Sequence, residues 1–207
     1  MFGFHRKSKQ HSDKTIASLV AAYPAVLGQD VKIALAVVPI AEHEPHSAIE
    51  PVKISGELIH IPSRVYFPEP SMQILDDLSE IQKTIISTLY TRHHDGFVRE
   101  RWVERVIGDP TAWVAPYVLQ LLGEYVIEIM NLLARRIDEL KEDRYQHFIR
   151  ENPDFCFLTC RRIVSYWACY FRRWSSPHFT DHVGYKVAKE IGLWQDDIAP
   201  RLTKPRN

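Results

Sequence analysis

The stretch "TRHHDGFVRERWVERVI", residues 91–107, decides how the middle of the chain folds. Apolar residues recur at helical spacing before this stretch, and Val98, Trp102 and Val106 form a new apolar face within it. The residues between the two faces are polar and include a glycine. We therefore expect one helix to end and a second helix to begin inside this stretch.

Two histidines and an aspartate stand side by side here, and such residues are common in metal and catalytic sites. Neighbouring side chains on a helix diverge by about 100°, so His93 and His94 cannot both face one ion while a helix continues. A turn explains the same residues. Gly96 can adopt the left-handed conformation that ends a helix, and Asp95 can accept hydrogen bonds from the first amides of the next helix. We therefore predict a turn rather than a site.

The chain divides into an N-terminal part and a helical part. Ser55-Gly56 is typical of a hairpin turn, whereas Ser79 and Gln82 have the spacing of a capping box at a helix start. The predicted fold class is therefore mainly α. The expected divisions are a flexible basic tail at residues 1–12, an N-terminal arm with a short helix and a possible β-hairpin at 13–70, a helical domain at 71–195 and a C-terminal tail at 196–207.

The longest periodic segment, residues 113–140, leaves two arrangements open. Its apolar residues keep nearly one phase, which favours a single helix of about 27 residues, about 40 Å long. A break at Gly123-Glu124 would instead divide it into two helices. The first arrangement predicts an irregular helical bundle, and the second predicts helices stacked in pairs.

Over residues 79–140 the sequence resembles HEAT-type helical repeats. "HHDGFVRERWVERVI" is similar to the second half of such a repeat, and "PYVLQLLGEYVIEIMNLLARRI" is similar to another. In this resemblance Asp95 corresponds to Glu124 and Val98 to Ile127, whereas Trp102 stands where such repeats usually carry alanine. The resemblance implies HEAT-like helical pairs, which bury their core between neighbours and expose an extended face to partners.

The composition is that of a globular protein without net charge. Lys plus Arg and Asp plus Glu number 26 each among 207 residues, although the C-terminal third is mildly basic. Cys156, Cys160 and Cys169 are too few for a disulfide scaffold, and we expect buried reduced thiols. No apolar run is long enough to span a membrane. We therefore expect a cytoplasmic protein that does not bind membranes.

Motifs of known enzyme classes, such as a P-loop, GxGxxG or GxSxG, are absent from the sequence. His43 and His46 have metal-like spacing, but they lie in a polar loop. His178 and His182 would share a helical face, but no HExxH motif accompanies them, and Thr180 is the expected N-cap of the following helix. We therefore predict no catalytic residue, no metal site and no cofactor, and an enzymatic activity has no positive support.

Acid–base catalysis would need a carboxylate pair, and the helical domain contains several glutamates. Glu124 and Glu128 share a face if the helix that carries them is continuous. Solvated charge is the commoner role of such residues on helices. We therefore expect both side chains to lie at the surface.

The segment "RRIVSYWACYFRRW" combines arginines with aromatic residues, a composition typical of interface hot spots and of single-strand nucleic-acid sites. A competing interpretation is a buried aromatic stripe, because Tyr166, Tyr170 and Trp174 recur with a period of four. The candidate binding residues are Arg161, Arg162, Trp167, Phe171, Arg172, Arg173 and Trp174.

Two functions fit these observations. The first is a non-enzymatic module that binds another protein or a second copy of itself, with a dimer possible through exchange of the N-terminal arm. The second is nucleic-acid binding, because alkylpurine DNA glycosylases of HEAT-like build grip a duplex with basic and aromatic residues. The neutral overall charge favours the first, and the basic C-terminal third supports the second.

Overall fold

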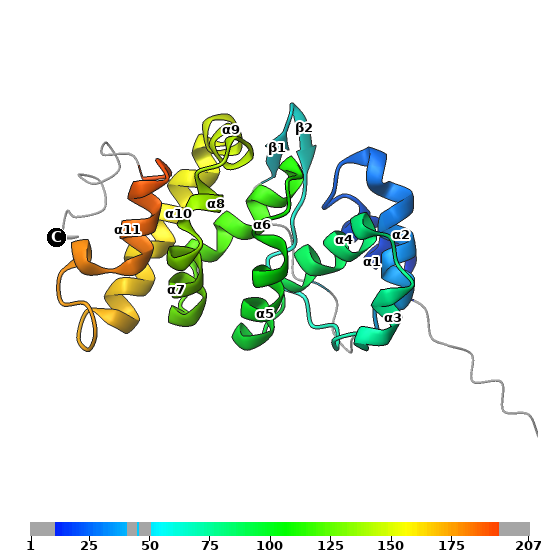
Figure 1. Ribbon diagram of the computed structural model, residues 1–207, viewed down its shortest axis with the longest axis horizontal. Helices are drawn as coiled ribbons and strands as arrows, with labels where there is room; N and C mark the ends of the chain where they lie inside the picture. The colour runs from blue at the N-terminus through cyan, green and yellow to red at the C-terminus, as the bar shows by residue number, and fades with distance from the viewer. Residues whose placement is uncertain (1–10, 41–44, 46–50, 195–207) are drawn as a thin grey trace, which may run out of the picture.

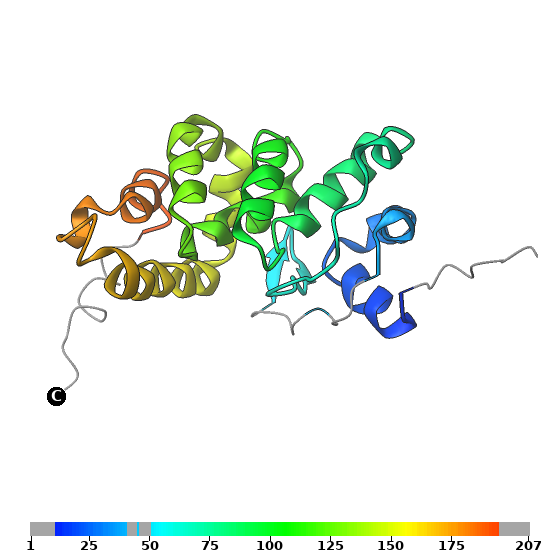
Figure 2. The same cartoon turned by 90° about the horizontal axis from the view of Figure 1, so that it is seen from below.

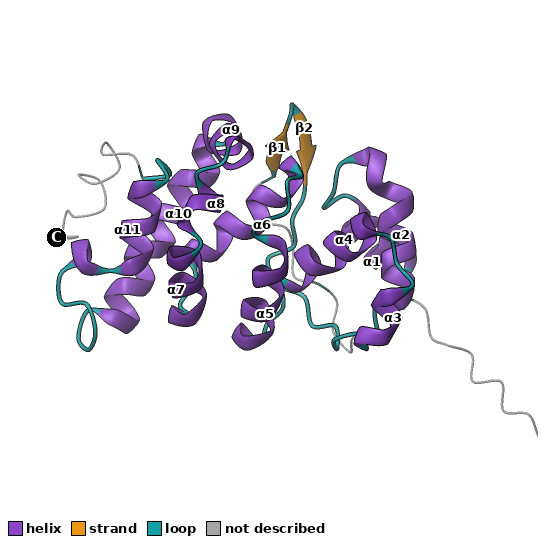
Figure 3. Ribbon diagram, viewed as in Figure 1, coloured by secondary structure: helices purple, strands orange, loops and turns teal. Residues whose placement is uncertain are grey.

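The computed structural model describes residues 11–40, 45 and 51–194. Within them the chain forms α-helices and one two-stranded sheet, so the predicted mainly α class is confirmed (Figures 1 and 3). None of the helices in these ranges is long and apolar enough to cross a membrane. His43, His46, the predicted C-terminal tail and all but the last two residues of the predicted basic tail lie outside the described residues.

The helices follow one another along the long axis of the molecule, from α1 and α2 at one end to α11 at the other (Figure 1). In chain order the elements are α1 (Asp13–Val20), the 3₁₀ turn η1 (Ala25–Leu27), α2 (Gly28–Val37), β1 (Val52–Ile54), β2 (Glu57–Ile59), α3 (Met72–Asp76), α4 (Glu80–Tyr90), α5 (Gly96–Val106), the 3₁₀ turn η2 (Ala112–Val114), α6 (Ala115–Leu119), the 3₁₀ turn η3 (Gln120–Gly123), α7 (Ile127–Arg135), α8 (Ile137–Leu140), α9 (Asp143–Glu151), α10 (Pro153–Tyr166), the π-helical turn η4 (Trp167–Phe171), the 3₁₀ turn η5 (Phe179–Asp181) and α11 (Val183–Glu190).

The helices pack in two layers. In one layer α10 packs against η3, and in the other α5 and α11 pack against the two sides of α7. Three pairs of elements also pack on each other: α4 with α5, η3 with α7, and α10 with α11. Figure 2 shows the layers edge-on, with the yellow helix α10 in a different row from the green helices α5 and α7. One hydrophobic core runs through the stack, from Leu19 near its start to Trp194 near its end.

The N-terminal arm belongs to this core. α2 packs on α4, and the β-hairpin packs against α9 through β1. The strands pair antiparallel around Ser55 and Gly56, whose φ angles of 52° and 85° are left-handed, as the predicted hairpin turn requires. The side-chain amide of Asn152 holds the hairpin to the helical part, since it accepts from the backbone N–H of Lys53 at 2.7 Å and donates to the carbonyl of Lys53 at 2.9 Å.

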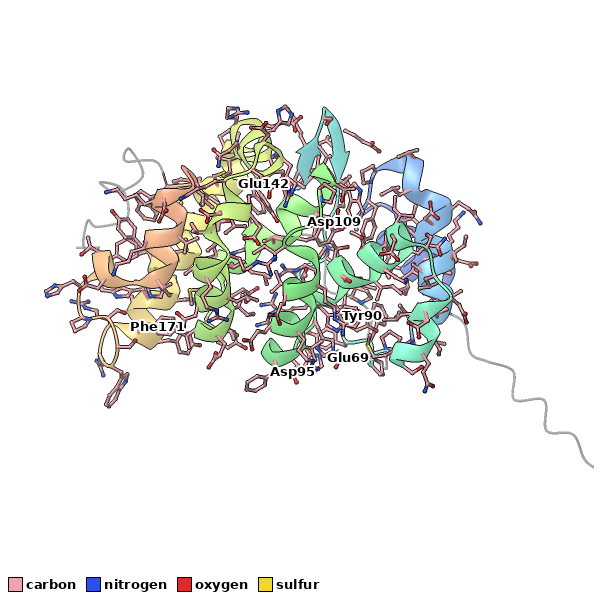
Figure 4. All side chains as sticks on the ribbon, viewed as in Figure 1. Glu69, Tyr90, Asp95, Asp109, Glu142 and Phe171 are labelled. Atoms are coloured by element: carbon pink, nitrogen blue, oxygen red, sulfur yellow. The ribbon has the colours of Figure 1, made fainter. Side chains whose placement is uncertain are left out.

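After the hairpin, the arm crosses the end of the α4–α5 pair. The hydroxyl of Tyr90 donates to the carbonyl of Pro68 at 2.6 Å, and the indole N–H of Trp102 donates to Glu69 at 2.6 Å. Figure 4 shows Glu69 close to Tyr90 and on the same side of the molecule as Asp95. The segment that leads into α3 is therefore tied to both helices of this pair.

The stretch at residues 91–107 forms the predicted turn. The capping box of Ser79 and Gln82 starts α4, and Asp95 caps α5 by accepting from the backbone N–H of Phe97 at 2.8 Å. The prediction for Gly96 was wrong, because this residue begins α5 and is not left-handed. A Cβ added to Gly96 would lie 2.8 Å from a methyl group of Val126, so glycine permits close packing here.

The segment at residues 113–140 is interrupted. α6 ends at Leu119, η3 follows, and Glu124 is extended with φ −113° and ψ 172° before α7 begins at Ile127. A single helix across this segment is therefore excluded. Gly123 lies at this break and packs closely on α10, because a Cβ added to it would lie only 3.0 Å from the Cβ of Arg162.

Candidate functional site

The carboxylate of Glu124 binds arginines from three separate segments. Its Oε2 lies 2.6 Å from Nη2 of Arg64, and its Oε1 lies 3.1 Å from Nη2 of Arg92. Nη2 of Arg99 lies 3.6 Å from Oε2, an ion-pairing distance beyond hydrogen-bond range. Glu124 is only 4% exposed, and the side chains of Arg92 and Arg99 are fully buried. We call these four residues the arginine cluster.

Backbone hydrogen bonds hold the arginine cluster in place. The arm pairs with the α4–α5 turn, because the N–H of Val65 donates to the carbonyl of Arg92 at 2.9 Å and the N–H of His94 donates to the carbonyl of Val65 at 3.0 Å. From α5, Nη1 of Arg99 donates to the carbonyls of His93 and His94 at 2.7 and 2.9 Å. The cluster therefore lies where the arm, the α4–α5 turn and the break before α7 meet.

The arginine cluster contains more positive than negative charge. Burial alone would raise the pKa of Glu124, but the charges of Arg92, Arg64 and Arg99 outweigh burial and lower this pKa below its ordinary value. Burial lowers the pKa of Arg92 to about 9 against the attraction of Glu124, so both groups are ionised at neutral pH. Nε and Nη1 of Arg92 and Nε and Nη2 of Arg99 are buried without a hydrogen-bond partner among the described residues.

This finding corrects the expectation for Glu124, which was predicted to be a solvated surface charge. The break after Gly123 turns the carboxylate away from a helix surface and towards the interior. Glu128 is exposed on α7, as expected. The two carboxylates therefore do not form an acid–base pair on one helix.

A pocket of about 250 Å³ lies beside the cluster, between η3, α10 and the arm, and we call it the basic pocket. Arg162 forms part of its wall because Gly123 lets the stem of Arg162 lie against η3. The amide oxygen of Gln120 is buried without a hydrogen-bond partner among the described residues. The pocket is lined by Ser63, Arg64, Gln120, Gly123, Glu124, Arg162 and Tyr166.

Three tyrosines lie next to the basic pocket, and we call them the tyrosine cluster. The ring centroids of Tyr125 and Tyr166 are 5.8 Å apart, those of Tyr125 and Tyr170 are 5.6 Å apart, and those of Tyr166 and Tyr170 are 6.0 Å apart. Tyr125 is 44% exposed and Tyr170 is 54% exposed. Tyr166 is part of both the cluster and the pocket wall. Exposed aromatic rings thus adjoin a pocket lined by arginine.

The π-helical turn that ends α10 explains why the ring of Tyr170 is exposed. The prediction of a buried stripe at Tyr166, Tyr170 and Trp174 was wrong, because Tyr170 is 54% exposed and Trp174 is 88% exposed. A π turn closes its hydrogen bonds over five residues instead of four, which shifts the phase of the side chains that follow. Phe171 is buried instead and stacks on His182, with ring centroids 4.9 Å apart.

The predicted binding residues do not lie on one surface. Phe171 lies near the C-terminal end of the stack (Figure 4), and its ring is inside the protein. The indole N–H of Trp167 donates to the carbonyl of Ser176 at 2.7 Å, so this ring holds the loop after η4. Arg162 lines the basic pocket. The remaining predicted residues, Arg161, Arg172, Arg173 and Trp174, are exposed.

The described cysteines and histidines form no metal site with other His, Cys, Asp or Glu residues in these parts of the chain. Cys156 and Cys160 are buried as predicted, but Cys169, which lies in the π-helical turn, is exposed. His182, not Thr180, is the N-cap of α11, because residues 179–181 form a separate 3₁₀ turn. His178 is exposed, whereas His182 is 1% exposed, so the two do not share a face.

The sequence did not single out Arg64, Arg92 or Gln120, because nothing in their local pattern distinguishes them from surface residues. Comparisons with known protein families, with curated proteins and with solved structures found no match to this chain.

Proposed function

We propose that this protein is a non-enzymatic, HEAT-like interaction module that binds another protein. The observation that carries the proposal is the tyrosine cluster beside the basic pocket. Tyr125 and Tyr170 expose about half of their side chains, although their rings are already held in contact with each other. Ordered aromatic residues beside arginines are the residue types that dominate binding energy at protein interfaces. A partner gains contact area here without the cost of ordering flexible side chains.

The chemistry of the surface selects the kind of partner. Arg162 forms no ion pair within the described parts of the chain, and Arg64 is 23% exposed at the pocket wall. These arginines favour an anionic group, while the tyrosines favour an apolar or aromatic one. The partner is therefore a protein segment in which an acidic group and apolar side chains stand close together.

The test compares partner capture by the native protein and by matched variants. We expect Tyr125→Ala with Tyr170→Ala to abolish capture of a specific cellular protein while leaving the melting temperature unchanged. The control is Phe97→Ala, which removes an exposed ring (66% exposed) that belongs to neither cluster and should keep capture. Loss of capture in the control as well, or retention in the double variant, contradicts the proposal. Sedimentation of the purified protein tests the alternative that this surface binds a second copy of the same chain.

Nucleic-acid binding is the second candidate, and the exposed end of η4 favours it. Trp174 is 88% exposed and directly follows the exposed Arg172 and Arg173. Base stacking on such a ring, with phosphate contacts from the arginines, would give salt-sensitive binding of single strands. Titration of labelled single-stranded and duplex DNA at two salt concentrations tests this. Absence of binding at low salt removes the candidate, and binding that Arg172→Ala with Arg173→Ala weakens supports it.

A further inference from the structure

We propose that the basic pocket binds a phosphate monoester group, presented by a segment of the protein partner. This inference rests on the proposed function for the source of the phosphate. Recognition of the group itself depends only on the pocket and can be tested without any partner.

The charge around the basic pocket favours a phosphate. The four guanidinium groups of Arg64, Arg92, Arg99 and Arg162 lie in or directly behind the pocket, and among the described residues in it only Glu124 opposes them. Buried charge that is not balanced destabilises a protein. An anion that binds in this pocket therefore neutralises an excess of positive charge that is already present. A phosphate monoester carries about −1.5 to −2 at neutral pH, whereas a carboxylate carries about −1. The phosphate therefore matches the excess better.

The hydrogen-bond donors of the basic pocket also favour a phosphate. Both carboxylate oxygens of Glu124 already accept from arginines, Oε2 from Arg64 and Oε1 from Arg92. The guanidinium of Arg162 has no hydrogen-bond partner among the described residues, and Arg162 lines the same cavity. Ser63 and Tyr166 also line this cavity, and each carries a hydroxyl that can donate a hydrogen bond. Phosphate has three strong acceptor oxygens, and this set of separate donors suits it better than a planar carboxylate.

The size of the basic pocket suits a phosphate group. A volume of about 250 Å³ is enough to hold a phosphate group with the first atoms of its carrier. Gln120 adds a buried amide without a partner for its oxygen. A protonated phosphate oxygen or the attached carrier can donate to this amide. The tyrosine cluster at the edge of the pocket then contacts the neighbouring residues of the same segment.

The experiment is calorimetric titration of the full chain at constant ionic strength with inorganic phosphate, O-phosphoserine, a phosphoserine peptide, its unphosphorylated form and a short single-stranded oligonucleotide. We expect inorganic phosphate to bind at concentrations on the order of 1 mM and the phosphopeptide to bind at least about tenfold more tightly. The unphosphorylated peptide should not bind. No heat from phosphate or phosphopeptide at concentrations on the order of 10 mM overturns the inference.

Variants locate the site. Arg162→Gln should weaken binding of phosphate about tenfold or more, because a charge-assisted contact is removed. The matched control is Arg161→Gln, since Arg161 is exposed, precedes Arg162 and lies over the ring of Phe157, with its Cζ 5.8 Å from the ring centroid, outside the pocket. Equal losses in the two variants would mean general charge attraction and overturn the inference. Ser63→Ala, which keeps every charge, provides a second variant in case Arg162→Gln alters folding.

The outcomes separate this inference from the proposed function. Phosphate binding that depends on Arg162, together with partner capture that does not depend on the tyrosine cluster, supports the pocket and contradicts the proposed function. Tyrosine-dependent capture without any phosphate binding supports the proposed function and overturns the pocket. Oligonucleotide binding tighter than phosphopeptide binding overturns the assignment to a protein segment.

Discussion

The guanidinium of Arg64 lies 2.6 Å from the carboxylate of Glu124, although the two residues are 60 positions apart in the chain. This contact joins the N-terminal arm to the break between η3 and α7. Arg92 and Arg99 approach the same carboxylate from the α4–α5 turn and from α5. One carboxylate thus pairs with three guanidinium groups. Removing Glu124 therefore breaks all three ion pairs at once, whereas removing one arginine breaks only one of them.

Replacing Glu124 by glutamine should lower the free energy of unfolding by about 3–5 kcal/mol, because it leaves buried arginines without a counter-charge. Glu128→Gln is the control, since this glutamate is exposed on α7 and should change stability by less than about 0.5 kcal/mol. Chemical denaturation measures both. A small effect at Glu124 would show that water or an ion already compensates the arginines.

Replacing Gly123 by alanine should destabilise the protein by about 1–3 kcal/mol, because the new methyl group overlaps the stem of Arg162 and pushes η3 away from α10. Gly28→Ala is the matched control, since a Cβ there meets only Val20 at an ordinary distance of 3.7 Å and alanine favours the helix. Thermal denaturation gives the melting temperatures of the two variants for comparison. Equal melting temperatures would contradict the close approach at Gly123.

Stability should fall as the pH drops from about 6.5 to about 4, in part because of His182. Burial lowers the pKa of His182 from 6.5 to about 4, and neither ring nitrogen has a hydrogen-bond partner among the described residues. Between pH 6.5 and pH 4 the imidazole takes up a proton in the unfolded chain but not in the folded protein. The free energy of unfolding is therefore highest above pH 6.5 and falls by about 3 kcal/mol as the pH drops to 4.

Denaturation of His182→Phe across this pH range checks the prediction, because phenylalanine keeps the ring stacked on Phe171 and cannot titrate. The variant should lose much of the pH dependence. His178→Gln alters an exposed histidine and should retain all of it. A pH profile of His182→Phe that matches the native one would disprove the role of this residue.

Two aromatic residues three positions apart should differ sharply in their effect on stability. Phe171→Ala removes a buried ring and should cost about 3 kcal/mol or more. Trp174→Ala removes a ring that is 88% exposed and should change stability by less than about 0.5 kcal/mol. Urea unfolding of both variants is the measurement. The reverse order would contradict the burial of Phe171 and the exposure of Trp174.

A thiol reagent should modify one cysteine of the native protein and three after denaturation. Cys169 is exposed, whereas Cys156 and Cys160 are buried. Burial raises the pKa of the Cys156 and Cys160 thiols to about 12, which removes the reactive thiolate at neutral pH. Mass spectrometry after brief labelling identifies the modified residue. Labelling of Cys156 in the native state would show that α10 opens.

The sequence by itself determined where several elements start and the class of fold. The capping box of Ser79 and Gln82, the cap at Asp95 and the hairpin turn at Ser55-Gly56 depend on neighbours within a few residues. Such short-range chemistry is complete in the local sequence. The apolar periodicity after residue 70 likewise predicted helices, because burial on one face requires that spacing.

Only the tertiary structure decided where the chain breaks and which polar residues are buried. The apolar phase continues through Gly123, so the local pattern allowed one helix, whereas in the folded protein the chain breaks there and Gly123 packs closely on Arg162 of α10. The π-helical turn moved Tyr170 from an expected core position to the surface. The arginine cluster joins segments tens of residues apart, and its energy comes from charges that meet only after folding.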